Sequence, residues 1–273
     1  GNGLIYSSNT KLIGAFNHLH IFIDPNPDPA ASFKERKRLF KLPRSSWTDY
    51  DEKLVSKGGG IFERAAKSIK ITPKMRAAFA LGPKDALTPN ELLRAMLTAP
   101  MGLLWFGGIG TYIKARNENN IDVGDRANDV IRINGNEVKA KIIGEGANLG
   151  ATQLGRIDYA LAGGRINTDF IDNSAGVGCS DHEVNIKILL GDAVAQGKLT
   201  MTQRNKLLAD MTDDVSALVL MDNYRQSMAL TNAQHQSIAL ADEHVRFMQT
   251  LERSGDLDRV VEFLPDDENF EQR

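Results

Sequence analysis

Two turns in the middle of the chain carry side chains that could hold a polar ligand. The sequence GEGAN at residues 144–148 follows the apolar run 140–143, and DNSAGV at residues 172–177 follows a second β-type segment. The amides of Asn148 and Asn173 can each donate and accept hydrogen bonds at once. In an open α/β sheet, ligands bind in the crevice at the carboxyl ends of the strands. We therefore expect both turns to face such a crevice.

The elements that must position these turns follow a strand, helix, strand, helix order over residues 139–190, with the second strand at residues 167–171. Another apolar run, LLWF at residues 103–106, also ends in glycines, at Gly107 and Gly108. Short apolar runs bounded by turn residues are typical of buried strands. The pattern predicts an open α/β sheet whose strands end in glycine and asparagine turns.

Composition limits the classes of function. The chain has 273 residues, of which 42% are hydrophobic, and its formal net charge is -2. This charge gives no electrostatic reason to expect nucleic acid or a membrane surface as a partner. The single cysteine, Cys179, suits a reducing compartment. No apolar run approaches the roughly 20 residues of a membrane helix, and no signal peptide is recognisable. We expect a soluble, cytoplasmic α/β protein.

Local signals place further elements. Residues 12–16 and 20–23 are predicted strands, and a helix is predicted from Pro29 to about Phe40. A helix also begins after Thr88, because TPNE combines an N-cap, a proline in the first turn and a glutamate three residues on. These signals depend on near neighbours only.

The last third of the chain has a different pattern. No strand-like run occurs after residue 190, and apolar residues recur there at helical spacing. Thr200 and Gln203 form a capping-box pattern. We expect two domains, an α/β domain over residues 1–195 and a helical region over residues 196–273.

A metal site is not expected. His18 and His20 would lie on one face of a strand. A metal ion would need at least one more ligand at defined spacing, and no cysteine or histidine cluster supplies it. A polar strand end is the favoured interpretation of this pair.

The amino terminus allows two interpretations. Gly1-Asn2-Gly3 looks like the end of a glycine-rich turn that enters a helix, but no strand precedes it. A dinucleotide fingerprint needs a strand first, then glycines, then a helix. Either the chain begins inside such a motif, or these residues are a frayed terminus or a tag remnant.

The central stretch resembles the glutamate dehydrogenases. Residues 138–148, VKAKIIGEGAN, are similar to the V-K-A-K-I-I-x-E-G-A-N of that family, and NSAGV at 173–177 is similar to its N-A-G-G-V. Ser180 and Glu183 also stand at the spacing of the family. A closer resemblance, to the large bacterial NAD-specific glutamate dehydrogenases, covers roughly residues 1–190 and weakens in the helical tail. It is carried by DPNPDPAASF, LPRSSW, GGIGTY, VGDRAND and ALAGGRINTDFIDNSAGV.

The resemblance implies an NAD-dependent oxidoreductase that interconverts L-glutamate with 2-oxoglutarate and ammonia. It also implies a Rossmann-like, doubly wound, mostly parallel sheet, followed by the helical region. In this family the dinucleotide turn ends in F-G-N-G, which Gly1, Asn2 and Gly3 match. We therefore expect a fragment without its first strand and without the catalytic lysine and aspartate domain, so that no catalytic residue lies in this chain and the chain alone is inactive.

The resemblance also assigns site residues. Asn148 and Asn173 are expected to contact the nicotinamide ribose or carboxamide of NAD. Gly107 and Gly108 are expected as backbone contacts for the pyrophosphate or ribose, and Gly1–Gly3 as part of the cofactor turn. The hydroxyl of Ser180 is expected to hydrogen-bond the side-chain carboxylate of glutamate.

Structural alternatives stay open for these residues. GEGAN can be a strand–helix turn in which Asn148 caps the next helix, and Asn173 can be a polar strand end. Ser180 and Glu183 form an S-x-x-E pattern that would open a helix running to about residue 194. A hydroxyl can cap a helix and bind substrate at once, so the two roles of Ser180 are compatible.

The residue that holds the adenosine ribose has two candidates. Dinucleotide folds place an acid about 20 residues after the glycines, a spacing that Asp24 fits. The end of the strand at residues 12–16 points instead to Asn17. Asn17 is neutral, which would weaken a preference for NAD over NADP.

Two other functions compete with this hypothesis. One is a stand-alone nucleotide-binding or regulatory module without catalysis. The other is a related dehydrogenase for branched or aromatic amino acids, against which Ser180 argues because an apolar pocket has no use for its hydroxyl. The complete protein is expected to be a homo-oligomer.

Overall fold

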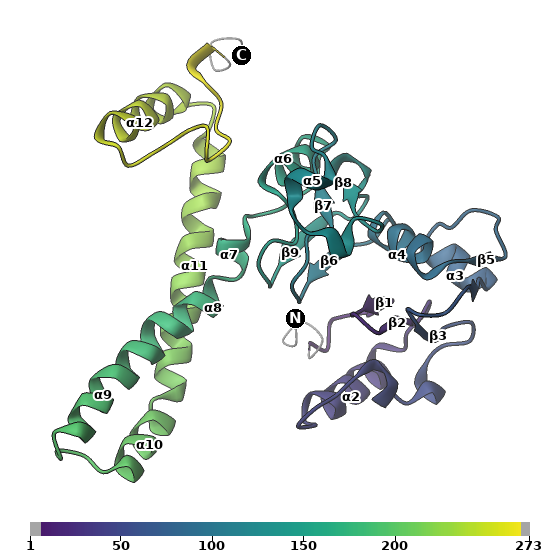
Figure 1. The fold of residues 1–273 in the computed structure, drawn as a ribbon, viewed down its shortest axis with the longest axis horizontal. Helices are drawn as coiled ribbons and strands as arrows, with labels where there is room; N and C mark the ends of the chain where they lie inside the picture. The colour runs from purple at the N-terminus through teal and green to yellow at the C-terminus, as the bar shows by residue number, and fades with distance from the viewer. Residues whose placement is uncertain (1–6, 269–273) are drawn as a thin grey trace. The chain divides into compact units, whose positions relative to one another are not determined.

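The computed structural model describes residues 7–268, so Gly1, Asn2 and Gly3 lie outside the described residues. The chain forms two compact units, residues 1–169 (unit 1) and residues 170–273 (unit 2), which are described separately (Figure 1). The predicted boundary of the NAD-binding domain at residue 195 stays a prediction.

The first part of unit 1 is a small antiparallel sheet. Strands β1 (Gly14–Phe16), β2 (His20–Ile23) and β3 (Gly60–Glu63) lie in the order β1-β2-β3. Both predicted N-terminal strands are therefore confirmed. They pair with each other antiparallel because the three-residue link between them is a hairpin, whereas a parallel pair needs a crossover of a dozen or more residues.

A helix covers this part of unit 1 where the prolines predict it. Helix α2 runs over Pro29–Phe40, with Pro29 in its first turn and the Asp28 carboxylate accepting from the N–H of Ala31. The apolar residues Phe22, Leu39 and Tyr50 are buried together between helix and sheet. The prediction from local signals is confirmed at both ends of the helix.

The middle of unit 1 consists of short elements around a second core. Thr88 and Glu91 form the expected capping box at the start of α4. The elements are the 3-10 helices Trp47–Asp49 and Glu52–Leu54, the antiparallel strands β4 (Ile69–Lys70) and β5 (Ala86–Leu87), and helices α3 (Pro73–Ala78) and α4 (Pro89–Leu97). Their core consists of Ile21, Ile23, Ile69, Ile71, Met75, Phe79, Leu92, Leu93, Met96, Ala99 and Ile131.

The last part of unit 1 contains two parallel strand pairs. Strand β6 (Leu103–Phe106) pairs with β9 (Ile142–Glu145), and β7 (Ile113–Lys114) pairs with β8 (Ile133–Asn134). Around them lie α5 (Asn120–Val123), the 3-10 helices Arg126–Asn128 and Gly135–Glu137, and α6 (Gln153–Leu161). The core of this part consists of Leu97, Phe106, Ile113, Ile133, Val138, Ala140, Ile143, Ala151 and Tyr159.

The fold class is confirmed as mixed α/β, but a doubly wound sheet is not. Among the described residues the strands form one three-stranded antiparallel sheet and three two-stranded pairs, two of them parallel.

The strand predicted at residues 167–171 is wrong, because Asp169–Asp172 forms the short helix α7. Just before this segment, Arg165 forms a single β-bridge with Ile142. The Asp169 carboxylate then binds a backbone N–H group and an arginine side chain. Whether a segment forms a strand depends on a neighbouring strand with which it can pair. Here the polar contacts of Asp169 replace such pairing.

Unit 2 is helical, as predicted for the C-terminal region. Within unit 2, α8 packs against the long helix α11, and α10 contacts both α9 and α11 (Figure 1). The helices are α7, α8 (Ser174–Cys179), a π-helix (Ser180–Val184), α9 (Asn185–Ala195), α10 (Met201–Asp210), α11 (Thr212–Gln236) and α12 (Ala241–Ser254). Thr200 caps α10 with Gln203, as predicted. Val219 is the one buried hydrophobic residue among residues 170–268, so the helices share a thin core.

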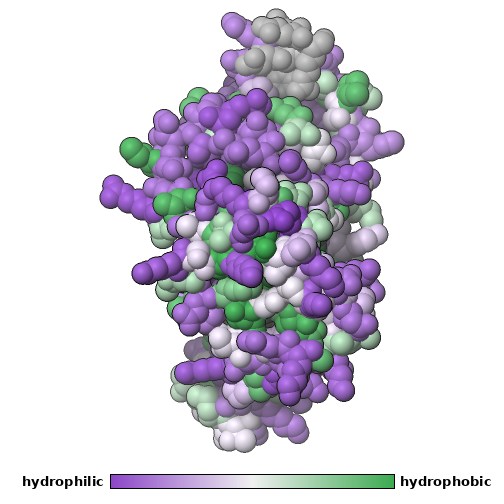
Figure 2. Space-filling view, turned by 90° about the vertical axis from the view of Figure 1, so that its right-hand side faces the viewer, coloured by the Kyte–Doolittle hydropathy of each residue, from purple (hydrophilic) through white to green (hydrophobic). Residues whose placement is uncertain are grey.

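The face of the molecule that Figure 2 shows is mostly polar. Figure 2 shows purple side chains over most of the face in view, with apolar groups in patches between them. Within residues 7–268, none of the helices combines the length and the apolar character that a bilayer span would require.

The capping box of α4 gives a test of local stability. Replacing Thr88 by Ala removes the hydroxyl that accepts from the N–H of Glu91. Urea unfolding should show a loss of about 1 kcal/mol. The matched control is Asn90→Ala on the same helix, because the Asn90 side chain is exposed and no hydrogen bond to it is found in the described part of the chain. Equal stability of the two variants would contradict the capping role.

The same box gives a test of pH dependence. The Lys84 ammonium, together with the N–H and hydroxyl of Thr88, lowers the pKa of Glu91 from its ordinary 4.5 to about 2. Because the pKa is lower in the folded state, this stabilisation is fully present above pH 4.5 and is lost as the pH falls towards 2. An NMR titration of the Glu91 carboxyl should show the low pKa, and Lys84→Met should raise it while Lys57→Met does not. A Glu91 pKa near 4.5 in the unmodified protein would refute the contact with Lys84.

Candidate functional site

The carboxyl ends of β6 and β9 form an open edge in unit 1. The two strands are parallel and in register, with Phe106 opposite Glu145. The turn that begins at Gly107 and Gly108 and the turn that leads to Asn148 therefore leave the sheet at the same edge. All three residues are exposed. The structure thus brings three of the predicted cofactor residues to the kind of edge at which α/β proteins bind ligands.

The glycines of GEGAN have a packing role that the sequence did not indicate. A Cβ atom on Gly144 would lie 2.5 Å from the Trp105 ring, and one on Gly146 would lie 2.2 Å from it. Cβ atoms do not occur at such distances, so the indole requires glycine at both positions. At these two positions the backbone admits the close approach of a side chain from the neighbouring strand. The indole N–H of Trp105 is buried and has no hydrogen-bond partner within residues 7–268.

The loop after β9 is held in a strained conformation by hydrogen bonds at its end. Leu149 has a positive φ of 61°, which costs a non-glycine residue on the order of 1 kcal/mol or more. Its N–H donates to Asp169 Oδ2 at 2.8 Å, and its carbonyl accepts from the Thr111 hydroxyl at 2.7 Å. The carbonyl of Gly150 accepts from the Tyr112 N–H at 2.9 Å. The position of Asn148, directly before Leu149, is therefore set by contacts from other segments.

Asn148 does not cap the helix that follows the loop. Helix α6 is capped by Thr152, whose hydroxyl accepts from the N–H of Gly155 at 2.9 Å. The alternative role of Asn148 as an N-cap is therefore wrong. Asn148 lies at the exposed edge of the sheet and not at a helix terminus.

A buried ion pair lies beneath this loop. Glu145, the last residue of β9, is fully buried and pairs with Arg156 Nε at 2.6 Å and Nη2 at 3.1 Å. Arg156 also lies 3.2 Å from Asp169 Oδ1. Burial raises the pKa of the Glu145 carboxyl, and the hydrogen bond from Arg156 offsets part of this effect. Arg156 and Asp169 were not singled out from the sequence, because they belong to no local motif of known chemistry.

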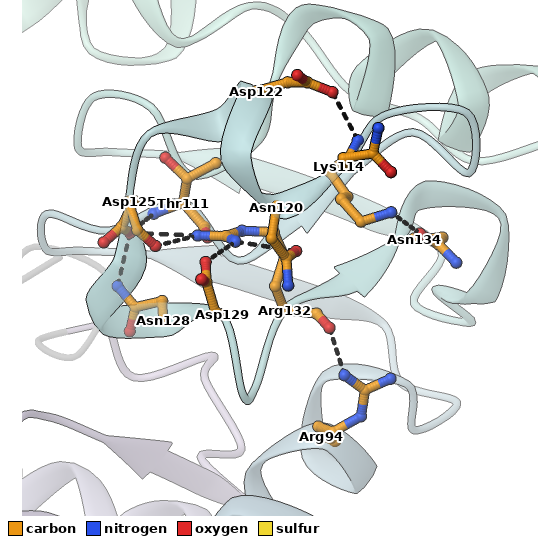
Figure 3. A network of polar contacts seen from close by, with 11 residues as sticks. Arg94, Thr111, Lys114, Asn120, Asp122, Asp125, Asn128, Asp129, Arg132 and Asn134 are labelled. Carbon is orange, nitrogen blue, oxygen red and sulfur yellow. Dashed lines mark hydrogen bonds and ion pairs between the residues drawn. The ribbon is translucent and has the colours of Figure 1, made fainter.

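The turn after β6 is held by a second polar network, drawn in Figure 3. Asp125 Oδ2 accepts from the N–H of Thr111 at 2.8 Å and from the Asn128 amide at 2.7 Å. The side chain of Arg132 is fully buried and donates to the Thr111 carbonyl at 2.9 Å and to Asp129. Burial alone would raise the pKa of Asp125, but the hydrogen bonds from Asn128 and Thr111 outweigh it and lower the pKa. The motifs GGIGTY and VGDRAND are thus in direct contact.

Both candidates for the ribose contact have structural roles in the N-terminal sheet. Asn17 Oδ1 accepts from the backbone N–H groups of Leu19 at 2.9 Å and His20 at 2.8 Å, which closes the β1–β2 hairpin. Asp24 is 1% exposed, and its Oδ1 accepts from the N–H of Ser56 at 3.2 Å. Its Oδ2 is buried without a hydrogen-bond partner among the described residues. A role of either residue at the ribose stays a prediction.

In unit 2 the structure corrects the start of a helix. Ser180 was expected to cap a helix, but it lies inside a continuous helical run from α8 through the π-helix to α9, with φ -67° and ψ -44°. The capping-box interpretation of Ser180 is therefore wrong. Its hydroxyl is exposed and lies 3.5 Å from the Gly176 carbonyl, which is long for a hydrogen bond.

The helix in fact begins about two turns earlier, at Ser174 after Asn173. Asn173 is the N-cap residue of α8, and its carbonyl accepts from the N–H of Gly176 at 2.9 Å. The glycine-rich sequence of α8 does not predict a helix. Helix α8 packs against α11, and such tertiary packing can override a low helix propensity.

The packing of Trp105 on the glycines can be tested by adding a single methyl group. Gly146→Ala forces the indole or the loop to move, and we expect a loss of roughly 1–3 kcal/mol in the free energy of unfolding. The control is Gly102→Ala, where a Cβ atom would meet nothing within 4 Å. Urea unfolding measures both variants. An unchanged Gly146→Ala protein would show that the indole does not occupy this position.

Comparisons with known proteins agree with these motifs. The family model for the catalytic domain of bacterial NAD-glutamate dehydrogenase matches residues 1–233. Proteins named NAD-specific glutamate dehydrogenase are 59% identical in Pseudomonas aeruginosa, 57% in Halomonas elongata and 49% in Mycobacterium tuberculosis. Each match covers 100% of this chain and 17% of the relative, so the chain spans only that share of the relatives' length. The chain belongs to the bacterial NAD-glutamate dehydrogenase family.

Proposed function

We propose that the chain supplies the NAD-binding part of an enzyme that oxidises L-glutamate to 2-oxoglutarate and ammonia by hydride transfer to NAD. The observation that carries this proposal is the open edge of β6 and β9, where two turns of family-specific sequence meet. The relatives are named NAD-specific, which supports NAD as the cofactor of this chain.

The proposed work of unit 1 is to bind and orient the nicotinamide end of NAD. The Asn148 amide can donate to and accept from the nicotinamide carboxamide or the ribose. The exposed backbone of Gly107 and Gly108 can approach the pyrophosphate or ribose without a side chain in the way. NAD itself supplies the hydride chemistry when it is bound. The contacts that hold Leu149 and Thr111 mean that little conformational freedom is lost on binding.

The proposed work of unit 2 is to add a second amide and a substrate contact. Asn173, at the start of α8, is the second proposed cofactor residue. The exposed Ser180 hydroxyl has only a long internal contact, so it is available to donate to the side-chain carboxylate of glutamate. An uncharged donor at this position favours glutamate over amino acids with apolar side chains.

The remaining parts of the activity are proposed for the complete protein. The catalytic lysine and aspartate implied by the family resemblance are assigned to the portion of the relatives that this chain does not span. The same portion would complete a Rossmann-like, doubly wound sheet around the β6–β9 pair. A homo-oligomer in the cytoplasm is proposed on the family resemblance and on the single cysteine.

Replacement of Asn148 tests the cofactor assignment. In the complete enzyme, Asn148→Ala should raise the KM for NAD about tenfold, since one hydrogen bond to a polar ligand contributes about 1–1.5 kcal/mol. The control is Asn117→Ala, an exposed asparagine that lies on another loop of unit 1. Glutamate-dependent formation of NADH and fluorescence titration with NADH measure the effect.

Two results would contradict the proposal in different ways. An unchanged KM for NAD in Asn148→Ala would remove Asn148 from the cofactor site. A complete enzyme that binds NADH but does not oxidise glutamate would favour a nucleotide-binding module without catalysis.

A further inference from the structure

We propose that Arg156 is a positioning residue for the cofactor loop, residues 146–149, and that it acts through Glu145 and Asp169. This inference rests on the proposed function, because it explains how Asn148 is held in position to bind NAD. Arg156 itself does not face the ligand. Arg156 lies on α6, behind the loop.

The guanidinium of Arg156 joins three segments of the chain. Two of its nitrogens hold both oxygens of Glu145, at 2.6 and 3.1 Å, and Nη2 also lies 3.2 Å from Asp169 Oδ1. Its Nη1 donates to the Gln153 side-chain oxygen at 3.1 Å. The planar fork of an arginine suits this bidentate geometry, and a lysine ammonium would not reproduce it.

Both carboxylates held by Arg156 also bind backbone N–H groups where the loop ends. Asp169 Oδ2 accepts from the N–H of Leu149 at 2.8 Å, and Glu145 Oε1 accepts from the N–H of Ala151, two residues after the loop, at 3.0 Å. The exit of the loop is therefore held by two groups that share one cation, and one of them, Glu145, directly precedes the loop. Without the clamp on Leu149, the positive φ of 61° at this residue has no compensating hydrogen bond at its N–H.

The position of Asn148 follows from this clamp. Asn148 directly precedes Leu149, so the direction of its side chain depends on the conformation that Asp169 imposes. Arg156 therefore sets the position of Asn148 through Asp169.

The test uses the complete enzyme with variants Asp169→Ala and Arg156→Gln. We expect the KM for NAD and the dissociation constant of NADH to rise about tenfold, as for loss of the Asn148 contact itself, while the KM for glutamate stays within about twofold. Arg156→Lys should recover part of the lost affinity, because an ammonium can still pair with one carboxylate.

The matched control is Arg116→Gln. Arg116 also pairs with a carboxylate of α6, that of Asp158, at 2.8 Å, and its side chain is 64% exposed. Loss of this pair should leave the KM for NAD unchanged. If Arg156→Gln fails to fold because Glu145 is left buried without a cation, Asp169→Ala and the charge-neutral pair Glu145→Gln with Arg156→Gln carry the test.

The outcomes separate the inference from the function on which it rests. Variants that unfold at lower temperature but keep the KM for NAD would overturn the positioning role and leave a purely structural ion pair. A rise in KM for NAD in Arg116→Gln of the same size would overturn it as well. Failure of the unmodified enzyme to bind NADH would instead refute the proposed function.

Discussion

The buried carboxylate of Glu145 is the constraint on which the rest of the site depends. A fully buried carboxylate is costly unless it is paired and hydrogen-bonded. Arg156 and the N–H of Ala151 meet this requirement, and in doing so they fix where β9 ends and where α6 begins. The loop that carries Asn148 has to close the gap between these two points. Its shape is therefore a consequence of an ion pair and not of the intrinsic preferences of the loop residues.

The turn after β6 is also held by a buried arginine, in this case Arg132. Arg132 is fully buried, and it reaches the Thr111 carbonyl and two aspartates of the neighbouring loop. Thr111 in turn donates its hydroxyl to the carbonyl of Leu149. The two polar networks therefore meet at Thr111, and the two turns at the open edge are held relative to each other before any ligand arrives. Preorganisation of this kind lowers the ordering cost of binding.

The sequence predicts those parts of the fold that depend on near neighbours. Thr88 and Thr200 cap helices as expected, and Pro29 begins α2, since each signal lies within one helical turn. The parallel strands β6 and β9 were found as apolar runs, and their shared edge followed from the rule for α/β sheets. The strand expected at residues 167–171 failed because Asp169 binds Leu149 and Arg156, which are distant in sequence. The helix start expected at Ser180 failed because packing on α11 decides it.

Three positions of the GEGAN turn have a physical cause inside unit 1. Gly144 and Gly146 leave room for the Trp105 ring, and Glu145 binds the buried arginine. The residue that follows the turn, Leu149, has a strained backbone that Asp169 holds. Asn148 lies exposed at the carboxyl edge of β9, directly before the residue that Asp169 holds. An amide in this place can both donate to and accept from a polar ligand, and that chemistry is the argument for its proposed contact with NAD.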